Sequence, residues 1–241
     1  MHLRNITSSQ RAAAKVAGFA YLFVLIVSIF AEFYVPTQLF RLDSAAETAR
    51  NIVAHEQMFR LGVASNLIGF VVDVALIAAL YVVTKPLSPH LALLAAAWRL
   101  METATMVSTT LKDLDVLRFL SGAEYLRAFE QDQLQALARF SISAHGSGYN
   151  VGLLLFGFGS TLFCYLWLKS GYVPRSLAAL GVLASVLVGA SAFAFILQPS
   201  LAKVISPGCF VPIFLFEMMM GLWLLLAELR PPVAAGTNES S

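Results

Sequence analysis

The stretch ALLAAAWRLMETATMVS, residues 92–108, is mostly apolar yet carries two full charges, Arg99 and Glu102. These two residues stand three apart, so on a helix they share one face. A charged side chain at the middle of a bilayer costs at least about 2.5 kcal/mol on insertion scales. The stretch therefore predicts a helix inside a membrane bundle, with its two charges facing partners on other helices rather than lipid.

The composition of the whole chain places this helix in a membrane. Of the 241 residues, 59% are hydrophobic and only 12% are charged, whereas an ordinary soluble domain has about a quarter charged residues. The mean hydropathy is +0.76. The small net charge of +2 gives no reason to expect a nucleic-acid partner. We therefore expect an integral membrane protein whose main partner is the lipid bilayer.

Six apolar runs are long enough to cross a bilayer, which takes about 20 helical residues. The runs are residues 16–35, 60–83, 90–111, 148–168, 175–197 and 208–227. Prolines stand at or near many run ends, where a missing N–H costs little. The sequence thus predicts an all-α fold, an integral membrane bundle of six transmembrane helices. One domain would cover residues 1–230, and a disordered polar tail would cover 231–241.

Two connecting segments are predicted to form amphipathic helices on the outer surface. The first opens with Ser44 and Glu47 at capping-box spacing and then places Ala45, Ala49, Ile52 and Val53 on one face. The second segment, residues 112–143, aligns apolar residues along one stripe among charges of both signs. The sequence leaves open whether this second segment lies on the membrane or forms a lid.

Basic residues in the short loops predict the orientation of the chain. With the N-terminus and the C-terminus both cytoplasmic, the inner side holds seven basic residues against two acidic ones. The outer side then holds eight of each kind. The excess of basic residues favours this orientation over the reverse.

Small residues recur at helical spacing in two of the runs. They are Gly148, Gly152, Gly157 and Gly159 in the fourth run, and Gly181, Ser185 and Gly189 in the fifth. In lipid, a small residue at every fourth position allows two helix backbones to approach closely. We therefore expect tight contacts between the fourth and fifth helices.

Four charged residues fall near the middle of their runs: Asp73, Arg99, Glu102 and Glu217. If all four faced lipid, the cost would be roughly ten kcal/mol or more, comparable with the net stability of a whole protein. We expect them to converge, with Asp73, Glu102 and Glu217 as candidate partners of Arg99. Three carboxylates and one guanidinium leave an excess of acid, which bound protons, a cation or a cationic ligand would neutralise.

A second tier of polar residues lies nearer the outer side. It comprises Glu32 in the first run, Asn66 in the second, and His145 and Asn150 at the mouth of the fourth. Asn66 precedes Asp73 by seven residues, two helical turns, so it joins the candidate ligand-binding or proton-relay residues. Glu32 is expected to reach the lipid headgroups, and Asn66 and Asn150 to form interhelical hydrogen bonds.

Familiar catalytic and metal-binding motifs are missing from the sequence. It contains no HExxH motif and no glycine-rich phosphate loop, and no lysine lies within any of the runs. We therefore expect no cofactor and no metal, and the sequence does not indicate an oligomeric state.

Three hypotheses for the polar residues stay open. The cluster binds a small-molecule or cationic ligand or relays protons, it holds the helices together in a structural or regulatory protein, or it serves a membrane-embedded enzyme. In the enzyme hypothesis Asp73 or Glu102 would act as the acid–base group.

Three blocks of the chain, together with its last apolar run, carry a resemblance to a known family. The blocks are DSAAETARNIVAHEQMFRLGVASNLIGFVVDVALIAALYVV (43–83), LALLAAAWRLMETAT (91–105) and LKSGYVPRSLAALGVLAS (168–185), and the run contains EMMMGLWLL (217–225). They resemble the bacterial domain of unknown function 4386 family. The resemblance implies a multi-pass protein of the bacterial inner (plasma) membrane, and it lends no assigned activity.

Overall fold

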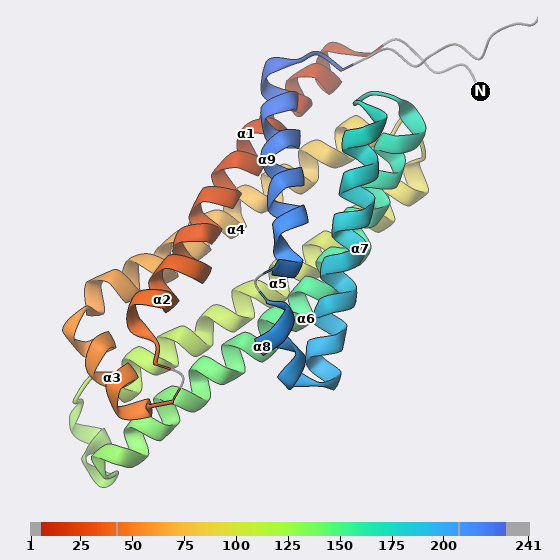
Figure 1. Cartoon of the computed structure of the whole chain (residues 1–241). Coiled ribbons are helices and arrows are strands. Elements are labelled where there is room, and N and C mark those ends of the chain that lie inside the picture. Colours follow the sequence, from red (N-terminus) through yellow and green to blue (C-terminus); the bar gives the residue numbers. More distant parts are fainter. Residues whose placement is uncertain (1–5, 42, 207, 230–241) are drawn as a thin grey trace, which may run out of the picture.

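The chain is helical throughout the part described by its computed structural model, which comprises residues 6–41, 43–206 and 208–229 (Figure 1). No strand occurs among these residues. The α-helices are α1 (Ser8–Ser28), α2 (Val35–Leu39), α3 (Ala45–Ala54), α4 (Glu56–Thr84), α5 (Pro89–Phe119), α6 (Gln131–Ser170), α7 (Arg175–Leu197), α8 (Ala202–Ile205) and α9 (Val211–Leu226). A π-helix, η1 (Ile29–Tyr34), joins α1 to α2, and the 3-10 segments are η2 (Glu124–Ala128), η3 (Pro199–Leu201) and η4 (Gly208–Phe210). The expected polar tail, 231–241, lies outside the described residues.

Five helical segments of the described chain are long and apolar enough to cross a membrane. They are Ser8–Leu39, Glu56–Thr84, Gln131–Ser170, Arg175–Leu197 and Gly208–Leu226. Each contains or closely matches one of the six apolar runs. The remaining run falls in α5, whose apolar part is interrupted by Arg99, Glu102 and several threonines. This polar content keeps α5 out of the apolar set although it has 31 residues.

The long helices begin and end at ordinary turn signals. Ser88 precedes α5 and accepts a hydrogen bond from the backbone N–H of Leu91 at 3.5 Å, and Pro89 takes the first helical position, where no N–H is needed. The long α6 ends at Gly171, whose φ of 68° is in the left-handed region that glycine adopts without strain. These turns reverse the chain between neighbouring helices.

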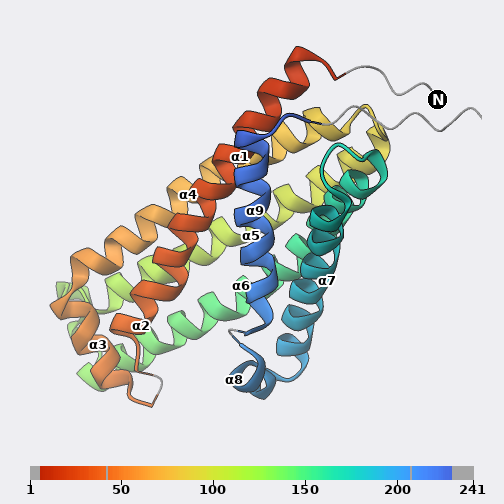
Figure 2. The same ribbon diagram turned by 45° about the horizontal axis from the view of Figure 1, so that its top comes forward.

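Six helices form a closed ring. Around it, α5 packs on α6, α6 on α7, α7 on α9, α9 on α1, α1 on α4, and α4 on α5. Figures 1 and 2 show this arrangement from two directions, with α9 running between α1 and α7. A ring of this kind has an interior that all six helices face, so side chains from distant parts of the sequence can meet there.

The two described ends of the chain lie side by side at one end of the ring (Figure 1). Gln10 Nε2 donates to the carbonyl oxygen of Val83 at the end of α4, over 3.2 Å. The Lys15 ammonium donates to the carbonyls of Leu225 and Ala227, where α9 ends. A cation at the last carbonyls of a helix is favourable because these groups have no partner within the helix.

At the opposite end of the ring, α3 packs against the first turns of α6 (Figure 1). As the sequence predicted, a helix follows Ser44, whose hydroxyl accepts from the backbone N–H of Glu47 at 3.1 Å. Ala49 and Ile52 are buried as expected. Val53, predicted to share their face, is exposed.

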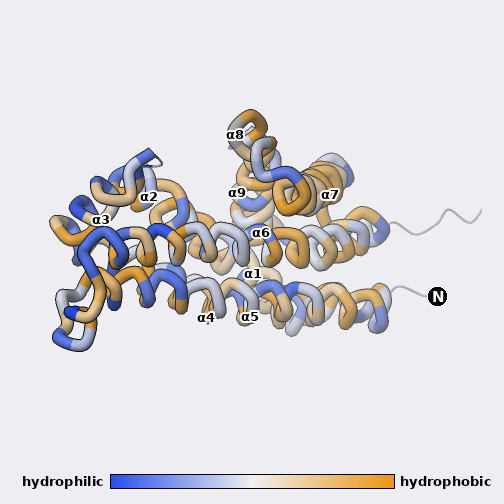
Figure 3. Tube along the Cα trace, turned by 90° about the horizontal axis from the view of Figure 1, so that it is seen from below, coloured by the Kyte–Doolittle hydropathy of each residue, from blue (hydrophilic) through white to orange (hydrophobic). Residues whose placement is uncertain are grey.

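The second expected surface helix, residues 112–143, is not a separate element, so that prediction was wrong. Residues up to Phe119 complete α5, η2 makes the turn, and residues from Gln131 onward begin α6. Sequence reasoning ended each span where charged residues begin. A helix, however, continues wherever its own backbone hydrogen bonds and a packing partner persist. Figure 3 shows hydrophilic stretches gathered around α3 at this end, while much of the remaining tube is hydrophobic.

The predicted close contact between the fourth and fifth spans is confirmed at one point. A Cβ atom added to Gly157 of α6 would lie 2.7 Å from Cα of Gly189 on α7, so the two backbones touch. By contrast, Gly148 and Gly152 face α5, where an added Cβ would meet Thr109 and Met106 respectively. The glycines of α6 therefore allow close packing against two neighbouring helices, α5 and α7, rather than against α7 alone.

Replacing Gly157 by leucine is expected to destabilise the protein by about 1–3 kcal/mol or more, because the new side chain would collide with the backbone of α7. The measurement is the apparent thermal unfolding midpoint of the purified protein in detergent. Gly146→Ala is the matched control on the same helix, since a Cβ added at Gly146 meets nothing within 4 Å. A Gly157→Leu midpoint equal to that of the control would contradict the contact.

Candidate functional site

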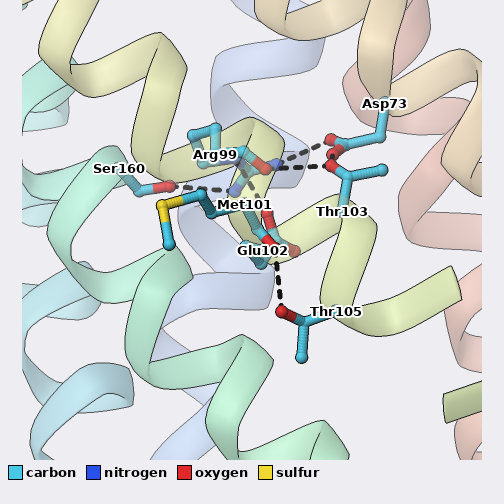
Figure 4. A network of polar contacts seen from close by, with 7 residues as sticks. All are labelled: Asp73, Arg99, Met101, Glu102, Thr103, Thr105 and Ser160. Atoms are coloured by element: carbon cyan, nitrogen blue, oxygen red, sulfur yellow. Dashed lines mark hydrogen bonds and ion pairs between the residues drawn. The ribbon is translucent and has the colours of Figure 1, made fainter. Parts of the chain in front are cut away.

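The guanidinium of Arg99 is held by side chains from three helices (Figure 4). Its Nη2 donates to Asp73 Oδ1 of α4 at 2.6 Å, and its Nη1 donates to Ser160 Oγ of α6 at 3.0 Å. Its Nε lies 3.2 Å from Glu102 Oε2 on the next turn of α5. Arg99 is only 5% exposed. The expected convergence of Asp73 and Glu102 on Arg99 is thus present.

Further residues determine where the guanidinium sits. Gly159 of α6 makes room for it, since a Cβ there would lie 2.7 Å from Cγ of Arg99. The ring of Phe156 lies 4.4 Å from Cζ of Arg99, a favourable cation–π distance. The hydroxyl of Thr103 donates to Asp73 Oδ2 at 2.7 Å. The Asp73 carboxylate therefore has a donor on each oxygen.

Glu102 is less well satisfied than Asp73. Its Oε2 is within ion-pair distance of Arg99 Nε, but the two atoms are not aligned as a hydrogen bond, and both are buried without a hydrogen-bond partner among the described residues. Glu102 is 7% exposed. A buried carboxylate oxygen without a donor is costly, so this atom offers an acceptor to any donor that enters beside it.

A cavity of about 120 Å³ lies inside the helix ring, next to Arg99. We call it the central cavity. All six ring helices contribute to its lining, among them α1 through Tyr21, α7 through Val188 and α9 through Glu217. The charged and amide groups on its wall are Glu32, Asn66, Asp73, Arg99, Glu102 and Glu217. Five of these come from the candidate set and the sixth, Glu32, from the second tier.

Glu217 lies on the cavity wall without touching the guanidinium. It is half-buried on α9, and no ion pair or hydrogen bond links it to Arg99. The predicted direct contact between Glu217 and Arg99 is therefore absent. In the ring, α9 packs on α1 and α7 and stands across from α5, which carries Arg99. Glu217 instead adds a carboxyl group that faces the open space.

A second polar group, which we call the Glu32 cluster, comprises Glu32, Asn66, Asp113 and His145. Asn66 Nδ2 donates to Glu32 Oε1 at 2.6 Å. The imidazole of His145 lies between two carboxylates, with Nε2 3.3 Å from Glu32 Oε2 and Nδ1 3.0 Å from Asp113 Oδ2. The side chains of Glu32 and His145 are only 14% and 15% exposed.

The expectation that Glu32 reaches the headgroups was wrong, and the reason is local backbone geometry. Glu32 lies in the π-helix η1, where the backbone N–H of Val35 donates to the carbonyl of Phe30, five residues earlier. Pro36 comes two residues after the end of η1 and has no N–H to give to the carbonyl of Glu32, four residues before it. The wider turn directs Glu32 toward α4 and α6, and such π-bulges are frequent at functional sites.

Sequence reasoning also missed three polar partners. Thr103 stands one turn after Arg99, and that spacing could have indicated it. Ser160 carries no such signal, and Asp113 was assigned to a surface segment because charged residues surround it in the sequence. Asn150 is half-buried on α6 but lines neither the central cavity nor the cavity beside the Glu32 cluster, so its interhelical hydrogen bond stays a prediction.

A family model described as "Domain of unknown function (DUF4386)" matches residues 16–227. The chain belongs to the DUF4386 family. No curated protein and no solved structure matches it. The DUF4386 match covers every residue of the Arg99 surroundings and of the Glu32 cluster, and the family carries no assigned activity that either group could inherit.

Replacing Arg99 by alanine should destabilise the protein by about 3–5 kcal/mol, because Asp73 and Glu102 would remain buried without their cation. The measurement is again the apparent thermal unfolding midpoint in detergent. Arg60→Ala is the control, since Arg60 pairs with Glu56 at 2.6 Å on an exposed surface and should cost less than about 1 kcal/mol.

The double variant Arg99→Met, Asp73→Leu should be less destabilised than the sum of its single changes, because it removes both charges together. Additive losses would contradict a direct ion pair between Arg99 and Asp73.

Proposed function

We propose that this DUF4386 protein is a single-domain membrane protein of six transmembrane helices. It binds a small cation, a proton included, in the central cavity. One observation carries the proposal: the wall of that cavity includes four carboxyl groups and a single guanidinium. Arg99 pairs with Asp73 and approaches Glu102, and Glu32 contacts Asn66 and His145. The carboxyl group of Glu217 therefore adds acid that no cation on this wall offsets.

Electrostatics in an apolar interior favours an occupant of positive charge. Unpaired carboxylates in such surroundings are strongly disfavoured, so they take up protons or attract cations. The buried Oε2 of Glu102, without an aligned donor, supplies an acceptor for an N–H or O–H group of the occupant. Tyr21, Tyr149 and Phe156 add aromatic faces on the same wall, and aromatic faces attract organic cations.

The size of the cavity restricts the occupant to small species. A volume of about 120 Å³ holds a few water molecules or a small organic cation, since each water in the liquid takes about 30 Å³. Several waters in contact with the carboxyl groups would equally serve to carry a proton. Lipids and peptides are too large for this space.

The proposal includes α5 as the sixth membrane-spanning helix. The described ends of the chain lie together at one end of the ring, as the pairing of Lys15 with the end of α9 requires. An even number of crossings returns the chain to the side where it began, and the five apolar helices alone would leave the ends on opposite sides. Because α5 lies in the ring between α4 and α6, it supplies the missing crossing.

The end of the ring that holds both termini is proposed to face the cytoplasm of a bacterium, with the ring in the inner membrane. Among the described residues, that end carries Arg11, Lys15, Lys85, Lys169 and Arg175, located at the first turns of α1 and at the turns after α4 and α6. An excess of basic residues in short loops marks the cytoplasmic side.

A second candidate function has its own support. Arg99 joins α4, α5 and α6 through Asp73, Glu102 and Ser160, as expected if the cluster only holds the helices together in a structural protein. The two candidates differ at Glu217, which has no part in that linkage.

Reporter fusions test the number of crossings. A green fluorescent protein fused after Pro86 should fluoresce, since that turn is proposed to be cytoplasmic, and alkaline phosphatase fused after Gly122 should be active outside. The opposite pair, phosphatase after Pro86 and fluorescent protein after Gly122, should be silent. Equal behaviour of the two sites would mean that α5 does not cross.

Neutralising Glu217 separates cation binding from a purely structural role. With methylammonium or tetramethylammonium present, the unfolding midpoint of the parent should rise, as linkage requires for a ligand of the native state. Glu217→Gln should lose most of that rise while its midpoint without cation stays close to that of the parent. Glu228→Gln is the control, because Glu228 is exposed beside Arg11 at the termini.

Proton transfer through the protein is measured in parallel. Parent protein and Glu217→Gln are reconstituted in vesicles that contain a pH-sensitive dye, and proton entry is followed under an imposed potassium-diffusion potential. Faster entry with the parent than with the variant supports the proton form of the proposal. If neither cation shifts the midpoint and both proteins give the leak of empty vesicles, the structural role stands instead.

A further inference from the structure

A second cavity, of about 210 Å³, lies beside the central one toward the α3 end of the ring. Its wall includes Phe40 after α2, Phe59 of α4, Asp113 of α5 and His145 of α6. It therefore lies at the end of the molecule opposite to the two termini, where the hydrophilic stretches gather (Figure 3).

The two cavities share two lining residues, Glu32 and Asn66. These residues are joined by the hydrogen bond from Asn66 Nδ2 to Glu32 Oε1, 2.6 Å long. Because Glu32 and Asn66 line both cavities and are hydrogen-bonded to each other, they form a partition between the two cavities. This hydrogen-bonded pair thus lies between the two cavities, with Glu32 also in contact with His145.

Different polar groups lie on the two sides of the partition. Toward the central cavity, the next polar group on α4 is Asp73, two turns beyond Asn66. Toward the second cavity, Glu32 faces His145, which in turn contacts Asp113. Carboxylates thus stand before, within and behind the partition, an arrangement that favours the passage of positive charge and disfavours anions.

The π-helix positions Glu32 in this partition. A π-helical turn occurs mostly as a short bulge and is frequent at functional sites. Pro36, four residues after Glu32, disfavours a return of this turn to α-helical geometry because it has no N–H for the Glu32 carbonyl. The movable part is therefore the Glu32 side chain, since a change of its rotamer would break the hydrogen bond to Asn66 without disturbing the Arg99 surroundings on α5.

We propose that the Glu32–Asn66 pair is a gate, through which a small cation or a proton passes from the second cavity at the α3 end into the central cavity. The identity of what passes rests on the proposed function. The existence of the passage does not, because it depends only on the two cavities and their common wall.

Another wall of the central cavity offers a competing route. Phe33 of η1 and Phe214 of α9 both line that cavity, and their rings meet edge to face with centroids 5.3 Å apart. Opening of this pair would connect the cavity sideways, between α9 and η1. The experiment therefore compares the two walls directly.

The test measures the rate at which thiol reagents reach each cavity. Both cysteines, Cys164 and Cys209, are buried and free and are first replaced by alanine. Gly146→Cys then reports on the second cavity, which Gly146 lines and where a Cβ meets nothing within 4 Å. Glu217→Cys reports on the central cavity. The probes are the cationic trimethylammonium-ethyl and the anionic sulfonatoethyl methanethiosulfonates, applied to the protein in lipid nanodiscs.

Asn66→Ala should open the partition. Labelling of Glu217→Cys by the cationic reagent should then accelerate about tenfold, the ratio that corresponds to one hydrogen bond to a charged group. Labelling of Gly146→Cys should not change. Phe214→Ala, the matched change in the competing wall, should leave the rate at Glu217→Cys near that of the parent.

Glu32→Gln is the second variant, and it retains the hydrogen-bond acceptor for Asn66 while removing the charge. The partition should stay closed, but the preference of the cationic over the anionic reagent at Glu217→Cys should fall. This variant keeps the proposal testable if Asn66→Ala does not fold.

Two results would overturn the gate. One is acceleration at Glu217→Cys by Phe214→Ala and not by Asn66→Ala. The other is a charge preference that Glu32→Gln leaves intact. Because labelling requires no bound ligand, the gate can fail while cation binding in the central cavity stands, and cation binding can fail while the gate stands.

Discussion

The structure depends on a single constraint, the accommodation of a guanidinium inside an apolar helical bundle. Arg99 cannot lose its proton, so its charge has to be met by the protein. Asp73 from α4 and Ser160 from α6 approach it from opposite sides, and Gly159 makes room for its aliphatic part. One side chain of α5 thereby links both neighbouring helices to it.

The closed ring of helices turns this local constraint into an internal site. Because α1, α7 and α9 complete the ring around α4, α5 and α6, the space beside Arg99 is enclosed by protein instead of lipid. Tight backbone contact at Gly157 and Gly189 closes one seam, and the hydrogen bonds of Lys15 with the end of α9 close another. Carboxyl groups that would be intolerable against lipid are tolerated on this inner wall.

Hydropathy predicted most of the fold, and the cost of isolated charges predicted the contacts of Arg99 with Asp73 and Glu102 but not the other polar partners. The apolar runs located all six ring helices, and the cost of isolated charges brought Asp73 and Glu102 to Arg99. Two kinds of error remained. Charged residues were taken as the ends of helices, although α5 and α6 continue past them on mutual packing.

Residues whose placement depends on three-dimensional detail were missed for a different reason. A π-helical turn, which no hydrophobic period reveals, carries Glu32 inward. Ser160 is visible only once α6 is seen to pack on α5. The position of Glu217 across the cavity follows from the order of helices in the ring, which single-helix periodicity does not contain.

If the ring of helices spans the membrane as proposed, any charge within the central cavity responds to the membrane potential. Carrying one elementary charge across 100 mV is worth about 2.3 kcal/mol, so a site half-way across the bilayer experiences roughly 1.2 kcal/mol of this. In the proposed orientation, with the termini on the negative, cytoplasmic side, a cation that enters from the α3 end would be held roughly sevenfold more tightly in an energised cell. Collapse of the potential would then weaken binding of the occupant by the same factor, without any change in the protein.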